Sequence, residues 1–311
     1  MTNFGVVITC SINDFLFAKG CCESVRYFMA DVPICLLVDG NFPVTNIAKA
    51  YNALVINRKD VKTPLLHQRS YGWGLTKMVA FWESPFERFL LLDADTCVWG
   101  NVGQYVDYHQ YDVILDQPCY AYSEEAINEY FFNTAQLTKL FPDFAYQSHP
   151  YVCTGVIFGK RNVFELSEYE AILDLKDRFP HLFKYGEMGL LNFMLFRAKQ
   201  AGTLRVGTAD MQYIVTDFDY DSTRKAFGLE EAPVVSENPT VIHWAGGVKP
   251  VLRDSSTYSL PMTYFRRRAL QKQGVPEGWI DAMLRKEDFL RELRLQSRYY
   301  QKRIRKLITG K

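Results

Sequence analysis

Two aspartates, Asp93 and Asp95, stand one residue apart directly after the apolar run 89–92. A short apolar run of this kind is typical of a buried strand. In an extended backbone, side chains two residues apart point to the same side, so the two carboxylates can offer oxygens to one ion. Such oxygens suit Mg²⁺ or Mn²⁺, which neutralise phosphate groups. The same string also fits a solvent-exposed turn capped by Asp95, so further residues must decide between the two interpretations.

A second group of chemically suitable residues lies in the segment 241–250. His243 ends a predicted strand, Gly246 and Gly247 follow it, and Lys249 comes six residues after the histidine. An imidazole can bind a metal, glycines let the backbone approach phosphate, and a lysine offsets phosphate charge. A lone histidine is more often a packing residue. Beside Lys249 and the two aspartates, it favours a site for a metal and a nucleotide diphosphate.

The elements that must position these residues alternate along the chain. Short apolar runs between Gly, Pro, Asp and Asn predict strands, and apolar residues three or four apart predict helices. We expect strands at residues 4–10, 34–38, 53–56, 89–92, 113–116, 151–158 and 240–243, and helices at 15–29, 71–82, 123–141, 161–177 and 187–199. This alternation predicts an α/β fold, in which ligands bind outside the carboxyl ends of the strands.

Composition limits the class of protein. The chain has 311 residues, 48% hydrophobic and 15% aromatic, which is enough for one large α/β domain with an appendage. No apolar run is long enough to span a membrane, the N-terminus does not resemble a signal peptide, and the seven cysteines lack metal-type spacing. We therefore expect a cytoplasmic protein.

The C-terminal segment differs from the rest of the chain. From Arg285 to Lys311 there are ten Lys or Arg and three Asp or Glu, whereas the whole chain has a net charge of +1. We predict a catalytic domain at 1–255 and a basic helical extension at 256–311. Helical spacing places six apolar residues on one face of the extension: Phe289, Leu293, Tyr300, Ile304, Leu307 and Ile308. This face would lie on an anionic membrane surface, dock on its own domain, or pair with its copy in a homodimer, and we expect no nucleic-acid binding.

Two other enzyme classes contain comparable strings. A phosphatase of the haloacid-dehalogenase type has its nucleophile in a DxDx(T/V) pattern near the start of its domain, whereas Cys97 occupies the T/V position here. A nucleotidyltransferase uses a glycine-rich loop after its first strand, and this chain has none there. The phosphatase remains an alternative interpretation.

Six motifs in order resemble the retaining family-8 glycosyltransferases, the group that holds glycogenin, galactinol synthase and bacterial lipopolysaccharide glycosyltransferases. They are the segment 11–20, LTKM at 75–78, LLLDADTCVWGNV at 90–102, TGVIFG at 154–159, GEMGLLN at 186–192 and HWAGGVKP at 243–250. The similarity covers residues 4–250. It implies the GT-A fold, a Rossmann-like mixed sheet flanked by helices that binds a nucleotide-diphospho-sugar.

The resemblance also implies roles for residues at matching positions. The metal ligands would be Asp93, Asp95 and His243. The nucleotide-sugar would contact Thr9, Ser11, Asn13, Lys77, Asp93, Ala94, Gly246 and Lys249. Three residues would act in catalysis: Lys249 at the diphosphate, Lys77 near the donor phosphates and sugar, and Glu187 beside the transferred sugar. A plain alternative for Glu187 is an acidic residue that the dipole favours at a helix N-terminus.

The activity that follows from the resemblance is a metal-dependent, retaining transfer of a hexose from a UDP-sugar to a hydroxyl group. The cofactor would be Mn²⁺ or Mg²⁺, and the acceptor a carbohydrate, a lipid-linked glycan or a protein. The chain departs from the family pattern at Cys153, Met188 and Val251. These positions surround the sugar and acceptor in the family, so the transferred sugar is not predicted, and a protein that binds a UDP-sugar without turnover stays open.

Overall fold

The computed structural model describes residues 3–72, 74–118, 121–229, 232–235, 237–252 and 257–309, without the side chains of 302 and 304–309. Cys119 and the predicted domain boundary between residues 255 and 256 lie outside the described residues. The same holds for the side chains of Ile304, Leu307 and Ile308. The division into a domain at 1–255 and an extension therefore stays a prediction.

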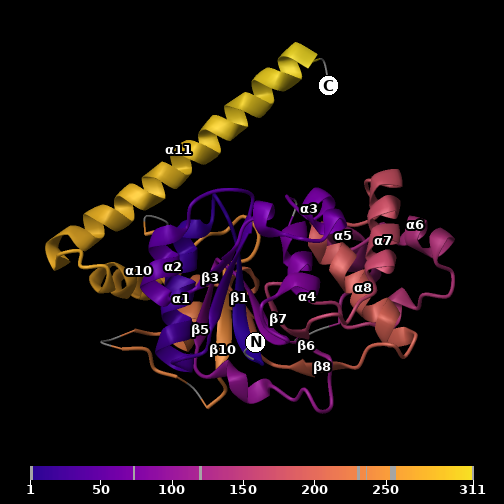
Figure 1. Cartoon of the computed structure of the whole chain (residues 1–311), viewed down its shortest axis with the longest axis horizontal. Helices are drawn as coiled ribbons and strands as arrows, with labels where there is room; N and C mark the ends of the chain where they lie inside the picture. Colours follow the sequence, from indigo (N-terminus) through magenta and orange to yellow (C-terminus); the bar gives the residue numbers. More distant parts are fainter. Residues whose placement is uncertain are drawn as a thin grey trace.

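The centre of the molecule is a seven-stranded mixed sheet in the order β3-β2-β1-β4-β7-β6-β8 (Figure 1). β1 to β4 run parallel, whereas β7 is antiparallel to both of its neighbours, β4 and β6. The strands are β1 (Phe4–Ser11), β2 (Ile34–Asp39), β3 (Leu54–Ile56), β4 (Arg88–Asp93), β6 (Val113–Asp116), β7 (Val156–Lys160) and β8 (Val206–Ala209). The alternation of strands and helices is the one predicted from the sequence, and the mixed sheet is the one that the family resemblance implied.

A second, three-stranded sheet lies against the carboxyl end of β4. It consists of β5 (Thr96–Trp99), β10 (Thr240–His243) and β9 (Gln212–Ile214), with β10 in the middle. β10 pairs antiparallel with β5, so that His243 is opposite Thr96. The chain thus passes from the large sheet into the small one through the two residues between β4 and β5, Ala94 and Asp95.

Helices cover both faces of the large sheet (Figure 1). Alternate residues of a strand point to opposite faces, so Val7 packs with η2, α4 and α8, while Val6 and Ile8 pack with α1 and α2. The α-helices are α1 (Phe15–Met29), α2 (Thr45–Tyr51), α3 (Pro64–Arg69), α4 (Ala80–Glu83), α5 (Glu124–Tyr130), α6 (Thr134–Leu140), α7 (Leu166–Arg178), α8 (Glu187–Gln200), α9 (Tyr220–Ala226), α10 (Leu260–Lys272) and α11 (Glu277–Thr309). Five 3₁₀ helices complete the described elements: η1 (Arg58–Asp60), η2 (Leu75–Val79), η3 (Val102–Tyr105), η4 (Tyr146–Ser148) and η5 (Val215–Asp217).

Three predicted elements differ from the structure for local reasons. The helix expected at 71–82 is η2 followed by α4, because Gly72 and Gly74 adopt positive φ angles before it. The helix expected at 123–141 is split into α5 and α6, since the Asn133 side chain accepts a bond from Gln136 N and starts a new helix. The strand expected at 151–158 begins only at Val156, because the backbone of Val152 bonds to the side chain of Asn192 instead of to a strand.

Helix α10 packs directly against α1. Gly20 permits this close approach, because a Cβ atom at that position would lie 2.5 Å from the sulfur of Met262. Apolar side chains from α1, β5, β10 and α10 form one cluster that includes Phe17, Trp99, Trp244 and Phe265. Within the described part of the chain, no helix combines the length and apolar composition that a membrane span requires.

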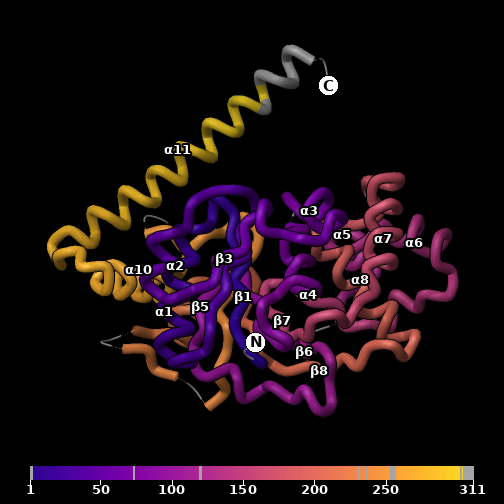
Figure 2. The backbone as a smooth tube through the Cα atoms, in the orientation of Figure 1, coloured from indigo at the N-terminus to yellow at the C-terminus, as the bar shows by residue number. Residues whose placement is uncertain are grey.

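Helix α11 follows α10 and extends beyond the body of the molecule (Figures 1 and 2). Its first half docks through Ile280, Leu284 and Asp288, which are buried. The apolar stripe predicted from the sequence is on a different face: Phe289, Leu293 and Tyr300 are 49%, 44% and 58% exposed. The described members of that stripe therefore do not dock on their own domain.

A buried ion pair joins α11 to α10. The Arg266 side chain is fully buried, and its Nη2 lies 2.8 Å from Asp288 Oδ1 and 3.1 Å from Glu287 Oε2. Asp288 also accepts a bond of 2.8 Å from the backbone N of Leu252. Asp288 therefore depends on a guanidinium group that water does not reach, whereas Glu287 also pairs with Lys19.

We expect Arg266→Ala to lower the free energy of unfolding by about 3–5 kcal/mol, because it leaves the buried carboxylate of Asp288 without its counter-charge. The matched control is Arg267→Ala, which removes an adjacent arginine paired with half-exposed Asp281 and should cost less than about 1 kcal/mol. Urea unfolding followed by circular dichroism measures both. Equal losses in the two variants would show that the buried pair contributes no more than the exposed one.

Candidate active site

The two aspartates of the DAD string occupy a turn that is fixed by backbone hydrogen bonds. Asp93 is the last residue of β4, and its N donates to Gly155 O of the β7 approach at 3.0 Å. Ala94 N donates to Thr9 O of β1 at 3.1 Å, and Asp95 O accepts from Trp244 N at 3.2 Å. The carboxylates thus come from a strand end and a turn, and not from one extended strand as the sequence argument supposed. The turn still brings them together.

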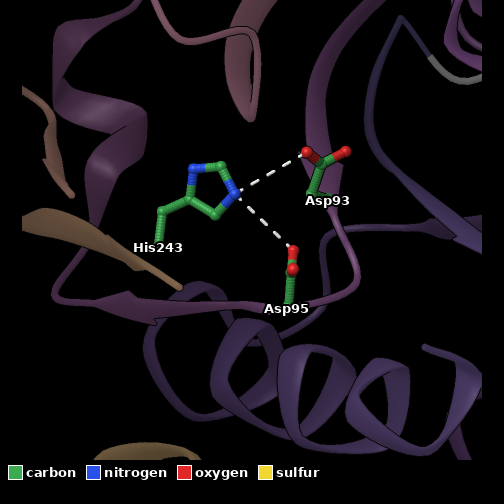
Figure 3. Close-up of side chains that lie close together, drawn as sticks. All are labelled: Asp93, Asp95 and His243. Atoms are coloured by element: carbon green, nitrogen blue, oxygen red, sulfur yellow. Dashed lines mark ion pairs between the residues drawn. The ribbon is translucent and has the colours of Figure 1, made fainter. Parts of the chain in front are cut away.

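His243 lies opposite these aspartates at the end of β10 (Figure 3). Its Nε2 is 3.7 Å from Asp93 Oδ2 and 3.6 Å from Asp95 Oδ1. The three residues offer ligand atoms that all lie within 4.8 Å of one another. The structure therefore brings together the three residues predicted as metal ligands, although they stand up to 150 positions apart in the sequence.

Gln212 orients the imidazole ring. Its Oε1 lies 2.9 Å from His243 Nδ1, and its Nε2 donates to Cys153 O at 3.2 Å. Because the amide oxygen only accepts, this bond assigns a ring hydrogen to Nδ1, so in the neutral ring Nε2, which faces the two carboxylates, carries the lone pair that can bind a metal. A partner of this kind on the second ring nitrogen is the usual way in which proteins orient a metal-binding histidine.

The lack of a side chain at Gly155 makes room for the ring. A Cβ atom there would lie 2.2 Å from His243 Cε1 and 2.4 Å from Nδ1. Such distances are far below van der Waals contact, so any larger residue would displace the imidazole. The position of His243 therefore explains why the TGVIFG motif has a glycine at residue 155.

Two lysines balance the negative charge of the site. Lys77 Nζ lies 2.9 Å from Asp93 Oδ2 and 2.6 Å from Glu187 Oε1, while Lys249 pairs with Asp95. Burial alone lowers the pKa of each lysine, but the carboxylates outweigh it and raise the pKa of both above the ordinary value. Burial likewise raises the pKa of Asp95, but Lys249 and His243 outweigh it and hold that pKa below the usual range. Each of the two lysines is thus charged beside a carboxylate.

Glu187 is the first residue of α8 and is buried. Its Oε1 accepts hydrogen bonds from Lys77 Nζ at 2.6 Å and from Thr154 Oγ1 at 3.0 Å. Gly74 gives it space, because a Cβ atom at Gly74 would lie 1.7 Å from Glu187 Oε2. The carboxylate is therefore held in one position, which goes beyond what helix-dipole stabilisation of an acidic residue requires.

A cavity of about 300 Å³ lies at the carboxyl ends of β1, β2 and β4 and contains most of the predicted nucleotide-binding residues. Thr9 Oγ1 and Asn13 Oδ1 are buried and have no hydrogen-bond partner among the described residues. Unpartnered buried polar atoms are costly, so Thr9 Oγ1, which lines this cavity, fits a polar group of a ligand, whereas Asn13 is not among the residues that line it. The lining includes Thr9, Ser11, Asp14, Asp39, Thr76, Lys77, Asp93, Ala94, Asp95, Glu187 and Lys249.

A second cavity of about 520 Å³ shares the charged residues and extends towards α5 and α8. Gly246 lines this cavity and not the first one, and it adopts a positive φ of 66°. Aromatic side chains from α5 and from neighbouring loops form much of its wall: Tyr122, Tyr130, Phe131 and Tyr185. The cluster of charges therefore separates a small polar cavity from a larger one with an aromatic wall.

Sequence reasoning missed several residues of the site. Asp39 ends β2 as Asp93 ends β4, and its Oδ1 accepts from Gly72 N and Thr76 Oγ1, both at 2.9 Å. The rule that found Asp93, an acid directly after a strand, applies equally to Asp39. Gln212 carried no such signal, because β9 is only three residues long and lies in a stretch broken by Gly, Asp and Pro.

The distances from His243 to the two aspartates fit one divalent ion. Two atoms that each bind an ion at about 2.1 Å can be at most about 4.2 Å apart, and the separations of 3.6 and 3.7 Å from His243 Nε2 to the two carboxylates satisfy this limit. One imidazole with two carboxylates suits Mn²⁺, and also Mg²⁺ where water supplies the remaining ligands.

We expect Gly155→Ala to weaken Mn²⁺ binding roughly 10- to 100-fold, the usual cost of disturbing the support of a metal ligand. The control is Gly247→Ala, where an added Cβ atom meets nothing within 4 Å. Isothermal titration of each purified protein with MnCl₂ measures the affinity. Wild-type affinity in Gly155→Ala would contradict the assignment of His243 as a ligand held in place by this gap.

Comparison with known proteins places this geometry in a structural class. Neither family models nor curated protein sequences match the chain. Among solved structures, the galactosyltransferase LgtC in complex with donor and acceptor sugar analogues is similar with a TM-score of 0.57 and 14% identity, over 88% of this chain and 98% of that one. The glycosyltransferase GlyE of Streptococcus pneumoniae TIGR4 is similar with a TM-score of 0.52 and 14% identity, over 91% of this chain and 64% of that one. The chain therefore has the GT-A fold of these glycosyltransferases, as the resemblance of its motifs implied.

Proposed function

We propose that this protein is a metal-dependent, retaining glycosyltransferase that moves a hexose from a UDP-sugar to a hydroxyl acceptor. The observation that carries the proposal is the group Asp93, Asp95 and His243, which lies at the carboxyl edge of a GT-A sheet. Lys77 and Lys249 contact the same carboxylates. Such a set of charges suits a diphosphate leaving group, because transfer builds negative charge on the departing phosphate.

The metal, which we propose to be Mn²⁺ or Mg²⁺, would be held by the two aspartates and His243 and would supply positive charge to the diphosphate. Lys249 lies on the loop that carries Gly246 and Gly247, and its Nζ also donates to Trp244 O at 3.1 Å. A loop with two glycines lets the backbone approach phosphate closely. Lys249 would therefore offset charge on the diphosphate from the side opposite Lys77.

Lys77 and Glu187 would act near the sugar. Lys77 contacts both Asp93 and Glu187, so one ammonium group fixes a carboxylate of the metal site and a carboxylate at the second cavity. A fixed carboxylate beside an oxocarbenium-like sugar lowers the energy of that state. Retention of the anomeric configuration is compatible with a covalent step on Glu187, and equally with entry of the acceptor on the leaving-group side.

The acceptor would enter through the cavity with the aromatic wall. Tyr130 and Tyr185 stand at this cavity with ring centroids 5.7 Å apart, and Tyr185 is 62% exposed. Aromatic rings offer flat apolar surface and a hydroxyl group, a combination that suits sugars. The chemistry fits a carbohydrate, a lipid-linked glycan or a protein side chain as acceptor.

The location of the protein also belongs to the proposal. We propose a cytoplasmic protein that attaches to an anionic membrane surface through α11, whose described residues Phe289, Leu293 and Tyr300 are exposed beside basic residues. Pairing of two copies through the same face is the competing use of that surface. The phosphatase alternative has little support, because the DAD string follows β4 and not the first strand of the fold.

We expect the purified protein to release UDP slowly from one sugar nucleotide in a panel of UDP-sugars, with Mn²⁺ present and no acceptor. Asp95→Ala should reduce this release by at least about 100-fold, because the metal loses a ligand. The matched control is Asp174→Ala, which removes an exposed carboxylate on α7 and should leave the rate unchanged. UDP release is measured with a coupled luminescence assay.

Each other outcome of this assay points to a defined alternative. If the protein binds UDP but neither releases UDP from any sugar nucleotide nor transfers a sugar to any offered acceptor, the result would favour a non-catalytic UDP-sugar-binding protein. Cleavage of a generic phosphomonoester with covalent phosphate on Asp93 would replace the glycosyltransferase by the phosphatase.

A further inference from the structure

The C-terminal helix contacts the loop that borders the nucleotide cavity. Between β1 and α1, the residues Ser11 to Asp14 form a tight turn in which Asp14 N donates to Ser11 O at 3.1 Å. Ser11 Oγ donates to Asp14 Oδ2 at 2.8 Å and accepts from Asn13 N at 3.2 Å. Ser11 and Asp14 line the cavity of about 300 Å³. The position of this turn therefore sets the shape of one cavity wall.

Two arginines of α11 hold the outer side of this turn. Arg291 Nε donates to Asn13 O at 3.0 Å, and Arg294 Nη1 donates to Ile12 O at 2.5 Å. Arg291 Nη2 also lies 3.9 Å from Asp14 Oδ1. The backbone carbonyls of Ile12 and Asn13 thus accept hydrogen bonds from guanidinium groups that lie 282 and 278 positions further along the chain.

The docked face of α11 ends at these contacts. Its residues that are not exposed recur at helical spacing, from Ile280 through Leu284 and Asp288 to Arg291 and Arg294, and every described side chain beyond Arg294 is exposed. Arg291 is further fixed by its position over the ring of Phe17, with Cζ 5.4 Å from the centroid, while Arg266 approaches the same ring at 5.6 Å. Contacts with α10 and α1 thus hold the helix as far as the turn, and its described side chains beyond Arg294 are exposed.

We propose that Arg291 and Arg294 are positioning residues, which hold the turn Ser11–Asp14 in the form that the donor nucleotide requires. The inference rests on the proposed function only for the identity of the ligand. Ser11 and Asp14, at the two ends of the turn, line the nucleotide cavity, and the carbonyls that bind the two arginines belong to Ile12 and Asn13 between them. A change in the docking of α11 would therefore change nucleotide affinity without touching the metal ligands.

The test uses Arg291→Ala, Arg294→Ala and the double variant in the full chain. Arg298→Ala is the matched control, because it removes the same charge from an exposed position one turn further along α11. Two quantities are measured: amide hydrogen exchange of the segment 9–17 by mass spectrometry, and the Kd for UDP with Mn²⁺ by calorimetry. Exchange in β4 (Arg88–Asp93) serves as an internal reference for the stability of the whole domain.

We expect the amide hydrogen exchange rates of Asn13 and Asp14 to rise roughly tenfold in Arg291→Ala and in Arg294→Ala, because each variant loses a charge-assisted hydrogen bond. The Kd for UDP should rise by a similar factor. Arg294→Lys should recover most of the loss, and the Kd for Mn²⁺ alone should not change. Exchange in the turn equal to that of wild type, with β4 unaffected, would overturn the inference. If the wild type binds no UDP, the proposed function fails, while the exchange data still decide whether the arginines hold the turn.

Discussion

Charge compensation between buried carboxylates and lysines is the interaction on which the site depends. Asp95 and Glu187 are buried, Asp93 is partly exposed, and without nearby cations these three carboxylates would repel one another. Lys77 bridges Asp93 and Glu187, and Lys249 pairs with Asp95. Because these ammonium groups already balance the carboxylates, the site is arranged before any ligand arrives. A pre-arranged set of charges is what makes electrostatic stabilisation of a leaving group effective.

The rest of the fold serves to bring these charges together. The turn between β4 and β5 transfers the chain from the large sheet to the small one, and backbone bonds from Thr9, Gly155 and Trp244 fix that turn. The small sheet then carries His243 to the two aspartates, with Gln212 behind the ring and Gly155 beneath it. Helix α8 contributes Glu187 from the other side. The charged groups and the histidine of the site thus come from four separate parts of the sequence, at residues 77, 93–95, 187 and 243–249.

Some of this arrangement could be predicted from the sequence and some could not. Strands such as β4 and β10, and helix α1, follow from apolar periodicity, which reports burial directly. Asp93, Asp95 and His243 were recognisable because each stands at or just after a strand end, where α/β folds bind ligands. Gln212 was not recognisable, because its role depends on how a three-residue strand packs beside β10. The contacts of Arg291 and Arg294 with the first loop were equally hidden, since charge pattern shows which residues are basic but not which carbonyls they meet.

The central claim is that the metal and the nucleotide bind as one unit at this edge of the sheet. Its most direct test is the Kd for UDP measured by calorimetry with Mn²⁺ and again with EDTA. A divalent cation and a diphosphate that bind side by side attract each other, so each strengthens the binding of the other, and such coupling is typically about 5- to 150-fold. We therefore expect at least about a tenfold lower Kd for UDP when Mn²⁺ is present. The same Kd in both conditions would contradict the account, because it would separate the metal site from the nucleotide site.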